Sequence, residues 1–333
     1  MNFAHQVSQH KTYFKSHKTH DINWRKEQLL QIKKLVTENE QLCLDALKSD
    51  LGKPAVEAWM TEVSYVAGDV DHVLKRLNKW AKKRRVSTPI VAQPGRSFIQ
   101  PEPQGTVLIM GAWNYPLQLV LAPLVAVLAA GNCAIVKPSE LSPATSALLA
   151  KLIPQYLDNN AVSVIEGAVE ETTELLQCQF DHIMYTGNGQ VGRIVMTAAA
   201  KHLTPVTLEL GGKSPVYIDK SADLTITAQR LAWGKWMNAG QTCIAPDYIL
   251  APKEIIPNLI SALKKQLLIM FGDDVEKSQH YGRIVNLRHT QRIASYMGSG
   301  EIVHGGKVDL TTNYIEPTII LEPALDSPIM TEE

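Results

Sequence analysis

Two short stretches of the sequence contain side chains that could carry out nucleophilic chemistry. Cys243 follows Gly240 on an expected turn after a helix, and Glu209 lies in a second glycine-containing stretch, residues 208–213. A cysteine thiol attacks a carbon centre well once it is ionised, and a carboxylate can act as a general base. Taken alone, Cys243 is better explained as a small buried hydrophobic residue, because free cysteine is among the most buried residue types. Together the two stretches predict thiol-dependent catalysis.

A third stretch has the spacing of a dinucleotide-binding turn. Residues 187–192 read Gly-Asn-Gly-Gln-Val-Gly, which matches the pattern G-x-G-x-x-G between an expected strand and an expected helix. In that pattern a carboxylate about twenty residues further on often binds the cofactor ribose. Glu209 has this spacing, so the residues alone leave it two roles, ribose ligand or general base. Gly187 and Gly192 could also simply allow close packing of strand and helix.

The elements that must position these residues alternate between strands and helices. Short, almost entirely apolar strands predict a parallel sheet with helices on both faces, and therefore an α/β fold. The expected strands are residues 107–110, 134–136, 162–165 and 182–185, and the expected helices between and after them are residues 117–130, 142–157 and 170–176. Ligands of such sheets bind where strands end and helices begin.

The segments on either side of this alternation differ from it. Residues 22–51 and 56–80 have apolar residues at helical spacing, and Pro94-Gly95 marks a turn between two extended pieces. We therefore expect a dinucleotide-binding domain from residues 1–85 and 104–208. We expect a projecting β-hairpin at residues 86–103 that contacts another subunit, and a second α/β domain at residues 209–333.

The composition excludes several other classes of protein. Lys plus Arg and Asp plus Glu both count 33, so there is no basic excess for nucleic acid or for an anionic membrane. The four cysteines are widely spaced and no histidines cluster, which argues against a disulfide framework or a metal site. The polar N-terminus and unpaired thiols favour the cytoplasm. The longest apolar run, residues 117–130, is too short and too interrupted to span a bilayer.

Five motifs in order give the sequence a family resemblance. They are Ala-Trp-Asn-Tyr-Pro at 112–116, Lys-Pro-Ser-Glu at 137–140, Thr-Gly at 186–187 with Gly192, Leu-Glu-Leu-Gly-Gly-Lys at 208–213, and Gly-Gln-Thr-Cys at 240–243. From about residue 24 to residue 333 the chain resembles the aldehyde dehydrogenase superfamily. Within it, the chain is most similar to the class 3 enzymes, which oxidise medium-chain and aromatic aldehydes.

The resemblance implies a set of cofactor contacts. In the family, a variant Rossmann fold binds NAD or NADP, and Lys137 and Glu140 would hold the adenine ribose. Trp113 would also line the cofactor site, and the turn with Gly187 and Gly192 would face the pyrophosphate. Glu209 is then free to act as general base. Many relatives have serine where this chain has Asn188.

The resemblance also implies a mechanism. The Cys243 thiolate would attack the aldehyde carbon, and the Asn114 side chain would hold the oxyanion of the resulting thiohemiacetal. Hydride transfer to the cofactor would leave a thioester, and Glu209 would activate the water that hydrolyses it to the carboxylic acid. The full-length protein would be a homodimer.

The end of the sequence coincides with one more family motif. Glu333 falls on the glutamate of Glu-Ile-Phe-Gly-Pro, which in the family holds the nicotinamide ribose, so we expect the C-terminal part of the catalytic domain to be missing from these residues. Two alternative functions stay open. One is a catalytically inactive dinucleotide-binding or interaction module. The other is a CoA-acylating aldehyde dehydrogenase, against which the presence of Glu209 argues.

Overall fold

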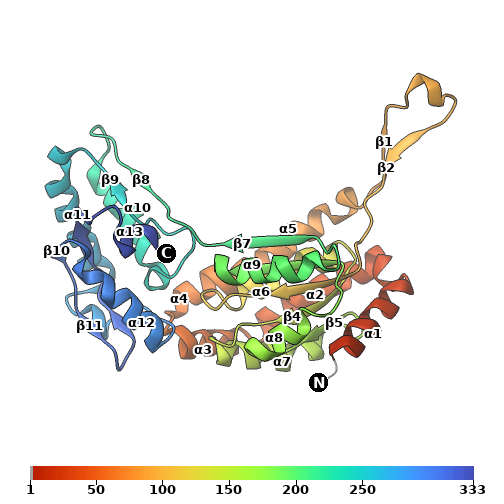
Figure 1. The fold of residues 1–333 in the computed structure, drawn as a ribbon, viewed down its shortest axis with the longest axis horizontal. Helices are drawn as coiled ribbons and strands as arrows, with labels where there is room; N and C mark the ends of the chain where they lie inside the picture. The colour runs from red at the N-terminus through yellow and green to blue at the C-terminus, as the bar shows by residue number, and fades with distance from the viewer. Residues whose placement is uncertain (1–2) are drawn as a thin grey trace. The chain divides into compact units, whose positions relative to one another are not determined.

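The computed structural model describes residues 3–333, which form two compact units (Figure 1). The first unit comprises the residues up to Cys43 together with Trp59–Glu209, and the second comprises Leu44–Ala58 and Leu210–Glu333. The sequence predicts that residues 44–58 belong to the first domain, whereas in the structure they pack within the second unit. Leu51 accepts a hydrogen bond on its carbonyl oxygen from the Arg283 amide at 2.7 Å.

A five-stranded sheet forms the centre of the first unit, with the strand order β5-β4-β3-β6-β7. The pairs β3/β4, β3/β6 and β4/β5 are parallel, as the apolar strand pattern predicts. The α/β fold is therefore confirmed. The strands are β3 (Thr106–Met110), β4 (Cys133–Lys137), β5 (Val162–Val164), β6 (His182–Gly187) and β7 (Val206–Leu210).

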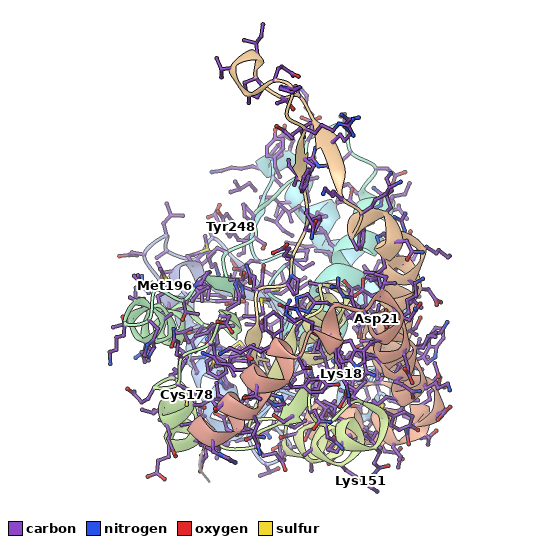
Figure 2. The ribbon with its side chains drawn as sticks, turned by 90° about the vertical axis from the view of Figure 1, so that its right-hand side faces the viewer. Lys18, Asp21, Lys151, Cys178, Met196 and Tyr248 are labelled. Atoms are coloured by element: carbon purple, nitrogen blue, oxygen red, sulfur yellow. The ribbon has the colours of Figure 1, made fainter. Side chains whose placement is uncertain are left out.

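Helices cover both faces of this sheet. On one face, α1, α8 and α9 share a buried cluster with Leu108 of β3 and Ile135 of β4. Helix α6 packs on β3 and β4, with α2 and α5 packed against it in turn. The helices are α1 (Phe3–Lys15), α2 (Ile22–Glu38), α5 (Ser64–Trp80), α6 (Gln118–Ala129), α7 (Pro143–Tyr156), α8 (Val169–Leu175) and α9 (Gly189–Ala200). Lys18 and Asp21 mark the turn between α1 and α2 (Figure 2).

Two expected helices are interrupted in the structure. The first ends at Glu38, and its C-cap Asn39 donates from the side-chain amide to the Leu35 carbonyl. A separate α3 (Glu40–Leu51) follows. The second consists of α4 (Ala55–Ala58), a π-helical turn (Trp59–Val63) and α5. The carboxylate of buried Glu62 in the π turn accepts the Leu117 amide at 2.8 Å. The turn thereby connects this helix to the start of α6.

The expected β-hairpin is present and begins slightly earlier than predicted. Strands β1 (Arg84–Val86) and β2 (Ser97–Ile99) pair antiparallel, with Arg84 opposite Ile99. The hairpin projects from the helical layer of the first unit (Figure 1). At its tip, Ile90 is 88% and Val91 is 91% exposed.

The second unit has short strands around a helical core. Its core contains Trp236 of α10 together with Leu263 and Phe271 of α11. Strands β8 and β9 pair parallel, whereas β10/β13 and β11/β12 pair antiparallel. The elements are β8 (Val216–Tyr217), α10 (Leu224–Trp236), β9 (Ile249–Leu250), α11 (Ile256–Phe271), α12 (Leu287–Ala294), β10 (Glu301–His304), β11 (Val308–Asp309), β12 (Tyr314–Ile315), β13 (Ile319–Leu321) and α13 (Pro328–Thr331).

One helical stretch in this unit, Lys253–Lys277, is long and apolar enough to cross a membrane by length and composition. Its central part is α11, which contributes Leu259, Leu263 and Leu267 to the core of the second unit. A buried apolar face on one side of a helix is the arrangement of a core helix in a globular unit.

Candidate active site

In the first unit, most of the predicted cofactor residues lie where parallel strands end. Trp113 and Asn114 follow β3, and both are half-buried. Lys137 is the last residue of β4, and Gly187 is the last residue of β6. Because β4 and β6 both pair parallel with β3, these positions share the carboxyl edge of one sheet. That edge is where open α/β sheets bind their ligands.

Lys137 and Glu140 are in direct contact. The Lys137 side chain is almost fully buried, and its ammonium donates to the Pro138 carbonyl at 3.0 Å and to Glu140 Oε2 at 3.3 Å. The Glu140 side chain is 43% exposed. A buried ammonium is stable only when it is paired and hydrogen-bonded, and these two contacts meet that need. The pair presents a fixed donor and an accessible acceptor, which suits the hydroxyls of a ribose.

The glycine turn leads directly into α9. A Cβ atom on Gly187 would overlap the Tyr185 hydroxyl oxygen, so this position has no room for a side chain unless the tyrosine moves. Asn188 is the N-cap of α9, and its side chain accepts the Val191 amide at 2.9 Å. Gly192 is buried within the helix. The start of this helix has the geometry that binds phosphate oxygens through backbone amides.

Asn188 therefore has a structural role that sequence analysis did not assign. Serine, asparagine and aspartate are all good N-caps, because each offers a side-chain oxygen to a free amide of the first turn. The asparagine in this chain fills that role through its bond to Val191.

Glu209 lies at the end of the edge strand β7. It is exposed, whereas its neighbour Leu208 packs against the core cluster of the first unit. Strand β7 lies beside β6 in the sheet. Alternation along the strand thus buries Leu208 and leaves the Glu209 carboxylate accessible to water, as a general base requires.

Cys243 of the second unit is exposed, and it follows an unusual backbone segment. Helix α10 ends at Trp236, and φ is then positive at Asn238 (55°), Ala239 (53°) and Gly240 (81°). Glycine and asparagine adopt this left-handed conformation readily, but alanine pays about 1–2 kcal/mol for it. The surrounding contacts must hold Ala239 in place.

Gln241 and Glu57 supply those contacts. The Gln241 amide nitrogen donates to the carbonyl oxygens of Asn238 (3.0 Å) and Arg283 (2.9 Å), and its oxygen accepts the Val285 amide at 3.0 Å. The Glu57 carboxylate accepts the Asn238 amide at 2.9 Å. The loop before Cys243 is thereby fixed from both sides. Sequence analysis missed Glu57, because 181 positions separate it from Asn238 and no short motif joins them.

Glu333 lies against the glycine turn of the second unit. A Cβ atom on Gly211 would overlap Glu333 Oε2, and Arg292 donates to the Glu333 carbonyl oxygen at 2.8 Å. Burial of the Glu333 carboxylate and the neighbouring charge of Asp247 raise its pKa above the ordinary value. The environment thus favours the protonated form more than water does.

Some of the predicted site residues are in contact in the structure, and the others are divided between the two units. Lys137 contacts Glu140, and Gly187 adjoins the helix that contains Gly192. Asn114 and Glu209 belong to the first unit, and Cys243 and Glu333 belong to the second. Among residues 3–333, no group of three or more His, Cys, Asp or Glu side chains could hold a metal ion.

The family follows from comparison with known proteins. Residues 2–333 match the model of the aldehyde dehydrogenase family. The chain therefore belongs to this family, as the five motifs predict.

Individual relatives indicate which class of the family the chain resembles most. It is 48% identical over 320 residues to the rat "Aldehyde dehydrogenase, dimeric NADP-preferring", covering 96% of this chain and 71% of the relative. It is 47% identical over 328 residues to rat "Aldehyde dehydrogenase family 3 member A2", covering 98% of this chain and 68% of the relative. A solved structure of Staphylococcus aureus AldH in a substrate-bound state has a TM-score of 0.96 and 44% identity, over 99% of this chain and 72% of that one. The resemblance to class 3 enzymes is thereby confirmed.

Proposed function

We propose that this protein oxidises an aldehyde to the carboxylic acid with NAD or NADP as the hydride acceptor. The observation that carries the proposal is the exposed thiol of Cys243 on a loop fixed by Gln241 and Glu57, in a chain whose other unit has the dinucleotide motifs at one sheet edge. A reactive cysteine needs access to its substrate and a defined position. Membership of the aldehyde dehydrogenase family supports the same reaction.

The residues present suit a dinucleotide. Gly187 keeps side-chain atoms away from the turn before α9, where the amides at the helix start can hold the pyrophosphate. Lys137 and Glu140 would hold the adenine ribose, Trp113 would line the site, and Glu333 would hold the nicotinamide ribose. When bound, the cofactor accepts the hydride. The Glu140 charge disfavours a 2′-phosphate, whereas the rat relative is named NADP-preferring, so we propose both NAD and NADP as cofactors.

The first half of the mechanism forms a covalent intermediate. The Cys243 thiolate attacks the aldehyde carbon, and the carbonyl oxygen becomes an oxyanion. The side-chain amide of Asn114 and the backbone amide of Cys243 donate hydrogen bonds to that oxygen. Loss of one such donor raises the barrier of acyl-transfer enzymes by about 3 kcal/mol.

The second half releases the product. After the thiohemiacetal is oxidised, a thioester links the acyl group to Cys243. Glu209 takes a proton from a water molecule, the water oxygen attacks the thioester carbon, and the thiolate leaves. General-base assistance of this kind contributes about a hundredfold or more in rate.

The substrate class and the assembly follow the family resemblance. We propose medium-chain aliphatic or aromatic aldehydes as substrates, a cytoplasmic location and a homodimer. The β1/β2 hairpin, with its exposed Ile90 and Val91, supports a role in subunit contact because exposed apolar tips favour association.

Product analysis tests this function. Purified protein is incubated with an aromatic or medium-chain aldehyde and NAD(P)+, with and without coenzyme A, and the acyl product is identified by mass spectrometry. We expect the free acid in both cases. An acyl-CoA product would establish the CoA-acylating alternative. Cofactor binding without any aldehyde oxidation would establish the inactive binding module.

A further inference from the structure

Lys213 has three polar contacts, and they join its own segment to two other segments of the second unit. Its ammonium donates to the carbonyl oxygens of Ile329 (2.7 Å) and Glu332 (3.0 Å) and forms an ion pair with Asp247. The side chains of Lys213 and Asp247 are only 20% and 19% exposed. An ammonium group has three donors, so these partners account for all of them.

The three segments are those that contain the predicted catalytic machinery. Lys213 lies four positions after Glu209, Asp247 lies four positions after Cys243, and the two carbonyl groups belong to the stretch that ends in Glu333. The mechanism described above gives Lys213 no chemical step. Its contacts nevertheless connect the Cys243 segment to the Glu333 segment.

The glycine turn before Lys213 provides the space for Glu333. The position that a Cβ atom would occupy on Gly211 is already filled by the Glu333 carboxylate. A Cβ atom on the adjacent Gly212 would have no heavy atom within 4 Å. Of these two neighbouring glycines, only Gly211 is a position where an added Cβ atom would meet the carboxylate.

Electrostatics explains why a cation is needed here. Asp247 and the Glu333 carboxylate are close enough that Asp247 raises the pKa of Glu333, while Lys213 and Arg292 act in the opposite direction. Two nearby carboxylates repel each other unless a positive charge compensates them. Removal of the Lys213 charge would leave that repulsion less compensated and would also free the Ile329 and Glu332 carbonyl groups.

We propose that Lys213 is a positioning residue that, together with the space at Gly211, fixes the Glu333 carboxylate relative to the segment that contains Cys243. This inference rests on the proposed function, because Glu333 is assigned to the cofactor by family resemblance. The polar contacts of Lys213 are with Asp247, Ile329 and Glu332, and none of them involves Cys243. Loss of Lys213 should therefore weaken cofactor binding much more than it changes the intrinsic reactivity of the Cys243 thiol.

Cofactor affinity tests the role directly. The Kd of NAD(P)+ is measured by fluorescence titration, without aldehyde, for wild type, Lys213→Met and Lys213→Arg. We expect Lys213→Met to raise Kd by about tenfold or more, the size expected for lost hydrogen bonds to a charged group. Arginine keeps the charge and several donors and should recover part of the loss. The rate of Cys243 alkylation by iodoacetamide, without cofactor, should change by less than about threefold, because no contact of Lys213 involves the thiol itself.

Two control variants separate positioning from general destabilisation. Lys277→Met removes an exposed ion pair to Asp274 in the same unit and should leave Kd within about twofold of wild type. Gly211→Ala displaces the Glu333 carboxylate without touching Lys213, so it should raise Kd as Lys213→Met does, whereas Gly212→Ala should have a clearly smaller effect. If Lys213→Met does not fold, the two glycine variants decide the question.

The outcomes are distinct from those of the functional test. Kd values for Lys213→Met and Gly211→Ala within about twofold of wild type, in an enzyme that still oxidises aldehydes, would overturn the positioning role alone. Wild-type protein that binds NAD(P)+ but oxidises no aldehyde would refute the proposed function and leave the role of Lys213 testable by affinity. Wild-type protein that does not bind NAD(P)+ would refute both.

Discussion

The two units of this protein support their functional residues in different ways. In the first unit, Lys137 and Gly187 end regular parallel strands, and the sheet itself sets their positions. In the second unit, Cys243 follows three residues with positive φ, and that loop is held by two groups distant in sequence, the Glu57 carboxylate and the Arg283 carbonyl oxygen. The cofactor residues of the first unit thus depend on secondary structure, whereas the nucleophile depends on a few specific hydrogen bonds.

This difference has a physical consequence for tolerance to mutation. A strand in the middle of a sheet is held by many backbone hydrogen bonds, so a single side-chain change at its end has local effects. A loop in a left-handed conformation is held by few contacts. Loss of one contact leaves fewer to hold the strained backbone in place. We expect mutations around Cys243 to affect catalysis more than mutations of similar size at the sheet edge.

The largest expected effect comes from Cys243→Ala in the second unit. Removal of the nucleophile should lower kcat by roughly 10⁴-fold or more, as the loss of a covalent nucleophile does in other enzymes. The Kd of NAD(P)+, measured by titration, should change little, because Cys243 is not among the residues assigned to cofactor binding. Retention of most of the aldehyde oxidation by Cys243→Ala would show that another group performs the attack.

Glu57→Ala tests whether the Glu57 carboxylate holds the loop before Cys243. It removes the acceptor of the Asn238 amide, so we expect the free energy of unfolding to fall by about 1–3 kcal/mol. The rate of Cys243 alkylation by iodoacetamide should change together with kcat. Glu57→Gln retains a side-chain oxygen and should recover part of both losses. Equal kcat for wild type and Glu57→Ala would show that the loop does not need this contact.

Gly187→Ala tests the turn at the carboxyl end of β6 in the first unit. Its Cβ atom would overlap the Tyr185 hydroxyl, and overpacking of this kind costs about 1–3 kcal/mol. We expect weaker NAD(P)+ binding by titration and a lower Tm by calorimetry. In Gly189→Ala the nearest atom, Arg193 Nη1, is 3.5 Å away, so this matched variant should have a smaller effect. Identical cofactor affinity for the two variants would contradict the assigned turn.

The smallest expected effect is a pH dependence of stability in the first unit. His10 donates from Nδ1 to the Asn160 carbonyl at 2.8 Å, and its Nε2 lies 2.8 Å from the Ser163 hydroxyl. Burial lowers the pKa of His10, against the opposing effects of Asn160 and Asp158. As the pH falls through the ordinary histidine value of about 6.5, the unfolded chain takes up a proton before the folded one does, so stability decreases.

His10→Gln should reduce this loss of stability without removing it. Burial also lowers the pKa of His20 and His182 in the same unit, so they contribute in the same direction. The measurement is Tm by calorimetry between pH 5 and pH 8, with His280→Gln, a change at an exposed residue of the second unit, as control. The same pH dependence of Tm in wild type and His10→Gln would contradict the effect of burial.

Much of the first unit could be predicted from the sequence, because its strands are continuous apolar runs. Strand 107–110 was predicted within one residue of β3. The break at Asn39 was missed because apolar spacing continues across it, and α1 was missed because polar residues separate its buried Phe3, Val7 and His10.

The site was harder to predict where it depends on long-range contacts. Lys137 and Glu140 are neighbours in sequence, and the structure joins them by an ion pair. In contrast, alanine at position 239 gives no sign of a positive φ, and nothing near Asn238 points to Glu57. The roles of Cys243 and Glu209 themselves rest on motifs, and they stay predictions until they are tested by mutation.

A pre-steady-state burst experiment tests the central claim most directly. Wild type, Cys243→Ala and Glu209→Gln are each mixed rapidly with aldehyde and NAD(P)+, and reduced cofactor is followed by absorbance. We predict sustained turnover for wild type and no signal for Cys243→Ala. Glu209→Gln should give a single burst of about one equivalent per active site and then slow turnover, because the thioester forms but is not hydrolysed. Sustained wild-type rates in Glu209→Gln, or any burst in Cys243→Ala, would contradict the mechanism.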